Sequence, residues 1–147
     1  MIKSESEIAF LVERFEDRTL PKEWWTHEAH LTVACWYLLN HSKEEATCYL
    51  RSGIITYNAY AGGENTTTGG YHETLTLFWI EVIHQFLSTL DGTILEKTNA
   101  FFASEYAEKD LFKKYYNLDD LFSVKARATW RQPDLQPIAI PAATITG

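Results

Sequence analysis

The sequence has little of several things that would set it apart from an ordinary globular domain. It contains two cysteines in 147 residues, Cys35 and Cys48, with no CxxC spacing. No disulfide framework is indicated, and we expect each cysteine to be a small apolar residue of a buried helix. The longest apolar run, residues 33–39, is far shorter than a membrane span. The N-terminal residues carry no apolar signal core, so we expect a cytoplasmic protein with no membrane partner.

Positive charge is also scarce. Lysine and arginine total 13 against 20 acidic residues, which gives a formal net charge of −7. The densest basic cluster, residues 109–114, is interrupted by Asp110. A chain with this charge repels phosphate backbones at long range. We therefore expect no nucleic-acid partner.

What the chain does contain is apolar and aromatic surface in helical order. Hydrophobic residues make up 46% and aromatic residues 14%, enough for a core that needs no disulfide or structural metal. Ser4, Ser42 and Thr93 are each followed three residues later by glutamate, the pattern of a helix capping box. Strand alternation is nowhere sustained. These signals predict one all-α domain over residues 1–147, a helical bundle of about six helices.

Two parts of this bundle are especially informative. The helix expected over residues 26–39 is apolar on nearly all sides, so we place it at the centre of the domain. After residue 130 the chain contains Pro133 and Pro137, which predict an irregular C-terminal segment. Its last residues, 138–147, are apolar, and we expect them to lie against the body or against a partner chain.

Three histidines form the candidate site. His27 and His30 lie one turn apart at the start of the helix over residues 26–39, and His72 begins another helix after a double glycine. If the two helix starts face one another, these side chains would bind one divalent metal ion, zinc or similar, and leave a position open. Glu73 would be a fourth ligand or a general base. The first hypothesis is therefore a metal-binding protein or a metal-dependent enzyme acting on a small molecule.

A second hypothesis uses the same region without a metal, as a pocket for a small molecule. Tyr71 and Trp79 would form its aromatic walls, and Thr76 would add a hydroxyl. Arg127 is the cation that would hold a ligand carboxylate, although a surface or structural salt bridge is the more common use of such an arginine. The alternative to both is a structural role, because first-turn histidines and carboxylates also stabilise helix ends.

A third hypothesis is an interaction protein. The apolar C-terminal residues and an exposed aromatic face would then be buried in a homodimer.

Several short blocks of the sequence are similar to an uncharacterised family of small bacterial proteins. The most specific block is residues 69–76, GGYHETLT, followed by Leu77-Phe78-Trp79. The others are residues 26–31 (THEAHL), 57–59 (YNA), 121–123 (LFS), Trp130 and 133–135 (PDL). The resemblance implies a single bacterial cytoplasmic domain. It implies no activity, substrate or cofactor.

Overall fold

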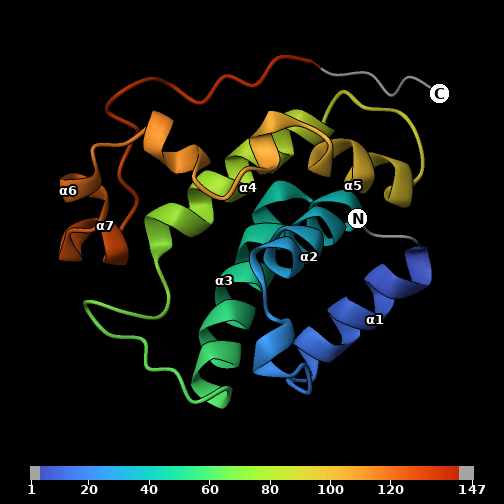
Figure 1. Ribbon diagram of the computed structural model, residues 1–147, viewed down its shortest axis with the longest axis horizontal. Coiled ribbons are helices and arrows are strands. Elements are labelled where there is room, and N and C mark those ends of the chain that lie inside the picture. Colours follow the sequence, from blue (N-terminus) through green and yellow to red (C-terminus); the bar gives the residue numbers. More distant parts are fainter. Residues whose placement is uncertain (1–3, 143–147) are drawn as a thin grey trace.

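Every element of regular structure in the computed structural model, which describes residues 4–142, is helical. The α-helices are α1 (Glu5–Glu16), α2 (His27–Asn40), α3 (Lys43–Tyr60), α4 (Glu73–Leu87), α5 (Ile94–Phe102), α6 (Leu118–Leu121) and α7 (Val124–Ala128). Three short 3₁₀ helices are η1 (Lys22–Trp24), η2 (Glu105–Ala107) and η3 (Leu111–Lys114). The predicted all-α domain is confirmed (Figure 1).

Side-chain caps explain where the five longer helices begin. Each cap accepts a hydrogen bond from the backbone N–H three residues further on, which satisfies a donor that the helix cannot use. The capping residues are Ser4, Thr26, Ser42, His72 and Thr93. The capping boxes predicted at Ser42 and Thr93 are both complete. The cap at His72 is unusual, because the acceptor is an imidazole nitrogen, whereas most N-caps use a hydroxyl or carboxylate oxygen.

Helix α2 lies at the centre, as predicted. It packs against α1, α3, α4 and α5 (Figure 1). Val33 and Cys35 on this helix have no exposed surface. A helix that is apolar on most sides is stable only where neighbours cover those sides, which is the position that α2 occupies.

The expectation of about six helices is close to what the structure has, and the differences lie in the short elements. The described residues contain seven α-helices, and residues 111–114 form a 3₁₀ helix. Helix α6, only four residues long, is capped by Asn117, whose side chain accepts a hydrogen bond from the Asp119 N–H. Elements of one turn carry too little periodicity to be predicted from apolar spacing.

The C-terminal segment is irregular and runs across α4 (Figure 1). Gln85 on α4 fixes it at two points. Its Nε2 donates to the Ile138 carbonyl at 3.1 Å, and its Oε1 accepts from the Ile140 N–H at 2.9 Å. Both isoleucines pack against the core. The predicted contact of the apolar tail with the body is therefore found at Ile138 and Ile140, and residues 143–147 lie outside the described residues.

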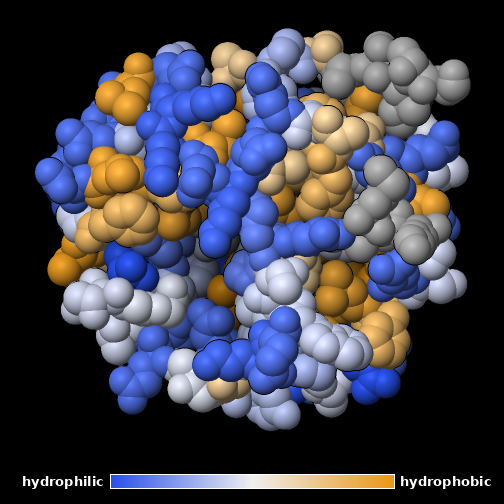
Figure 2. Space-filling view, in the orientation of Figure 1, coloured by the Kyte–Doolittle hydropathy of each residue, from blue (hydrophilic) through white to orange (hydrophobic). Residues whose placement is uncertain are grey.

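On the face drawn in Figure 2, apolar side chains gather in several patches that polar side chains separate. No helix within residues 4–142 combines the length and the apolar character needed to cross a lipid bilayer.

Candidate functional site

His72 uses both of its ring nitrogens inside the protein. Nδ1 accepts from the Leu75 N–H at 3.1 Å, and Nε2 lies 2.8 Å from the Leu121 carbonyl, to which it donates. Burial lowers the pKa of His72, so its ring is neutral at pH 7. With Nδ1 and Nε2 both engaged, no lone pair is left to bind a metal ion.

His27 and His30 also point to separate surroundings. His27 Nε2 lies 3.1 Å from the Ala107 carbonyl, and its ring meets Trp79 edge-on. His30 lies over the Trp25 ring, with centroids 3.9 Å apart. Its burial, helped by the nearby His27, lowers the pKa of His30 to about 4.

The structure does not bring the three predicted histidine ligands together. Trp79, which His27 contacts, is seven residues beyond His72, about 10 Å along the axis of α4. The start of α2 therefore meets the middle of α4 and not its beginning. Within residues 4–142, no group of three or more His, Cys, Asp or Glu side chains is placed to hold a metal ion.

Glu73 is held by a cation that the sequence did not single out. Arg51 on α3 donates to both carboxylate oxygens, Nε to Oε1 at 3.0 Å and Nη2 to Oε2 at 2.7 Å, and the Tyr71 hydroxyl donates to Oε1 as well. Burial raises the pKa of Glu73, but the bonds from Arg51 and Tyr71 outweigh it, and the net pKa is lowered. A carboxylate occupied in this way ties α3 to α4 and is poorly suited to take up a proton.

The other residues predicted to bind a ligand likewise bond within the protein. Thr76 donates to the His72 carbonyl of its own helix at 2.8 Å. Arg127 reaches two backbone carbonyls, those of Gly70 at 3.4 Å and Tyr71 at 3.3 Å, rather than a carboxylate. Trp79, three residues after the GGYHETLT block, packs against His27 of α2. The side chains of the block and of Trp79 thus join α4 to neighbouring helices.

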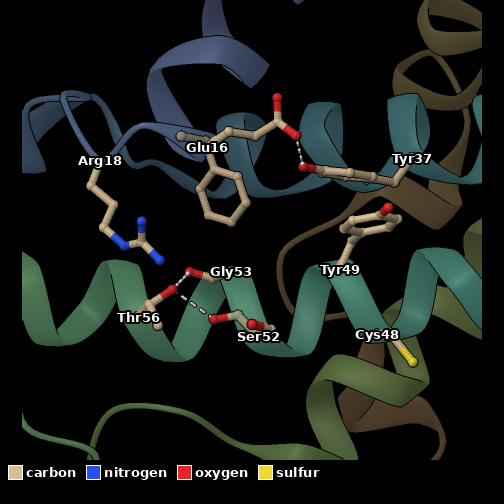
Figure 3. A pocket seen from close by; sticks show the side chains of 9 residues that line it. Glu16, Arg18, Tyr37, Cys48, Tyr49, Ser52, Gly53 and Thr56 are labelled. Atoms are coloured by element: carbon tan, nitrogen blue, oxygen red, sulfur yellow. Dashed lines mark hydrogen bonds between the residues drawn. The ribbon is translucent and has the colours of Figure 1, made fainter.

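A pocket of about 390 Å³ lies elsewhere, at the end of α1 and between α2 and α3 (Figure 3). Its floor and one wall are aromatic, and its rim carries charged and hydroxyl groups. The lining residues are Phe15, Glu16, Arg18, Tyr37, Cys48, Tyr49, Ser52, Gly53 and Thr56. None of them belongs to the predicted site.

Gly53 allows α3 to approach the floor of this pocket. A Cβ at this position would lie 2.7 Å from the Phe15 ring. Phe15 is buried and stacked on Trp25 at 4.8 Å between ring centroids, so the ring has little room to move. An isolated glycine inside a helical pattern often has a packing or functional reason, and Gly53 is a sign of this contact in the sequence.

The aromatic wall is joined to Glu16. The Tyr37 hydroxyl donates to Glu16 Oε2 at 2.7 Å, and the rings of Tyr37 and Tyr49 stack with centroids 5.4 Å apart. Burial, together with the bond to Glu16, raises the pKa of Tyr37. The phenol therefore stays protonated and acts as a hydrogen-bond donor near neutral pH.

Cys48 corrects an expectation from the sequence. It was expected in the core, but it is exposed and lies at this pocket, whereas Cys35 is buried as predicted. The buried positions of α3 include Ala46, and two residues further along an α-helix the side chain points about 200° round the axis.

Comparison with protein-family models, curated protein sequences and solved structures finds no match for this chain. The resemblance to a bacterial family stays a prediction from the sequence blocks alone.

Proposed function

We propose that this protein binds a small organic molecule in the pocket between α1, α2 and α3. The observation that carries the proposal is the gathering of three aromatic rings, Phe15, Tyr37 and Tyr49, around a hollow of about 390 Å³. Ligand pockets in proteins span about 300–1,000 Å³ and combine apolar walls with a few polar groups. The pocket has this size and composition.

The groups around the pocket are suited to holding a ligand. Tyr49 is half exposed, which leaves one ring available for stacking. Ser52 and Thr56 place hydroxyls along the α3 side, and Glu16 adds a carboxylate that is oriented by Tyr37. Stacking surfaces with oriented polar groups at the edges give both affinity and orientation.

The other functions predicted from the sequence have less support. A divalent metal ion held by His27, His30 and His72 in an enzyme would need a lone pair of His72, whose two ring nitrogens are both bonded within the protein, and His27 Nε2 lies beside the Ala107 carbonyl. A homodimer stays a prediction, and the oligomeric state in solution would test it.

The proposal is tested by blocking the pocket without disturbing the core. Ser52 is exposed and lines the pocket, so Ser52→Trp would place an indole in its mouth. Ala59→Trp, at an exposed position of the same helix that does not line the pocket, is the matched control. Binding of a library of neutral aromatic fragments is followed through the backbone amide NMR signals.

We expect fragments that shift the signals of residues 49–56 in the native protein and in Ala59→Trp. Ser52→Trp should bind them at least ten-fold more weakly. Binding that is equal in both variants, or no binding of any fragment to the native protein at millimolar concentration, would overturn the proposal.

A further inference from the structure

Arg18 differs from the other arginines of the chain in the partners of its guanidinium. Arg51 pairs with Glu73, Arg131 pairs with Asp120, and Arg127 donates to backbone carbonyls. Arg14 bonds to the Thr19 hydroxyl and lies over the Phe10 ring. Within residues 4–142, Arg18 is the arginine whose side chain makes no hydrogen bond or ion pair.

The backbone at Arg18 is held in an uncommon conformation. Its φ is +62°, the left-handed region, which costs a residue other than glycine about 1 kcal/mol. Two hydrogen bonds close the turn around Arg18: the N–H groups of Thr19 and Leu20 both donate to the Arg14 carbonyl. In this conformation the Arg18 side chain reaches over the pocket, toward Thr56 on α3 (Figure 3).

An unpaired guanidinium beside a pocket favours an anionic ligand group. Arginine presents parallel N–H donors that match a carboxylate, and such a bond strengthens as water leaves the site. Arg18 is the one cation among the nine lining residues, and Glu16 lies on the same rim. A group with two or more negative charges would meet Glu16 and a protein of net charge −7. The charge balance therefore favours a single carboxylate over a phosphate.

We infer that the ligand of this pocket is a small aromatic monocarboxylate, whose carboxylate is bound by Arg18 and whose ring lies against Tyr49 and the Phe15 floor. The inference rests on the proposed function, since it names the class of molecule that the same pocket takes. The aromatic rings would give affinity for many flat molecules, and Arg18 would select the anions among them.

The test compares two probes of nearly the same shape and different charge. Indole-3-acetate and indole-3-acetamide are titrated separately into the native protein and into Arg18→Gln, again with amide NMR signals as the readout. Lys22→Gln makes the same change of charge at an exposed residue that does not line the pocket. Arg18→Gly removes the guanidinium and also relieves the left-handed backbone, so a loss of fold is not the cause of its effect.

We expect the acetate to bind the native protein and Lys22→Gln at least ten-fold more tightly than the amide. This preference should disappear in Arg18→Gln and Arg18→Gly and should shrink at high salt. Equal binding of both probes to the native protein, or a preference that survives both Arg18 variants, would overturn the inference and leave the pocket as a site for neutral aromatic molecules. Failure of both probes and of the neutral fragments would remove the proposed function as well.

Discussion

Thr74 is the residue where one atom should matter most for the stability of this fold. It has no exposed surface, and its hydroxyl meets three backbone groups of the C-terminal part. Oγ1 lies 2.6 Å from the Ala126 carbonyl and 2.9 Å from the Thr129 carbonyl, and it accepts from the Arg131 N–H at 3.0 Å. One hydroxyl thus joins the first turn of α4 to α7 and to the segment that follows.

Thr74→Val replaces this hydroxyl by a methyl group of similar size. One donated and one accepted hydrogen bond are lost without a cavity, and each is worth about 1 kcal/mol, so we expect a loss of about 2 kcal/mol in the free energy of unfolding. Helix α7 has five residues and cannot satisfy these carbonyls internally. With a urea dependence of about 2 kcal/mol per molar, the unfolding midpoint should fall by about 1 M.

Thr76→Val is the matched control, because the same atom is changed two residues away. The Thr76 hydroxyl donates to the His72 carbonyl within its own helix and joins no other helix to α4, so its loss should cost less than about 0.5 kcal/mol. Hydrogen exchange at the Arg131 amide should accelerate in Thr74→Val and remain unchanged in Thr76→Val. Equal midpoints for the two variants would refute this assignment of Thr74.

Three further predictions concern His72, His30 and the ion pair between Arg51 and Glu73. His72→Ala removes the cap of α4 and the bond to Leu121, so it should lower stability by about 1–2 kcal/mol, seen in urea melts. Elemental analysis of untagged protein should find the metal content unchanged, and a stoichiometric metal that disappears in the variant would restore the metal hypothesis. A double-mutant cycle with Arg51→Met and Glu73→Gln should give a coupling of about 1 kcal/mol, since Arg51 is partly exposed, and a value near zero would contradict a stabilising pair.

For His30, the pKa of about 4 lies below the unfolded value of about 6.5, so the unfolded chain binds the proton first. Stability should be full above pH 6.5 and fall by up to about 3 kcal/mol as the pH drops to 4. Unfolding measured across this range should lose that part of its pH dependence in His30→Gln, and an unchanged dependence would argue against a buried neutral ring.

The local features of this protein follow from neighbouring residues. A cap and the helix it begins lie within four positions of the chain, which is why Ser42 and Thr93 could be assigned in advance. The central place of α2 followed in the same way, because a helix that is apolar on most sides has to be covered. The boundaries of the short elements could not be predicted in this way, since one helical turn holds too few residues for a pattern.

The candidate site could not be predicted from neighbouring residues. His27, His30 and His72 share the ligand chemistry of zinc, but spacing along the chain does not say which part of α4 meets the start of α2. Glu73 finds its partner Arg51 across 22 residues, and Thr74 finds its own across more than 50. Such pairs depend on how helices pack, which is decided by shape and burial over the whole domain.

What the sequence by itself determined is an all-α domain with capped helices and a buried α2, because hydrogen bonding and apolar spacing act over a few residues. Only the tertiary structure decided where the functional groups meet. It places both ring nitrogens of His72 against backbone groups of the protein, and it sets Arg18 beside the aromatic walls of Phe15 and Tyr49. The reason is that a pocket is formed by side chains from separate helices, whose relative positions follow from close packing of the whole core.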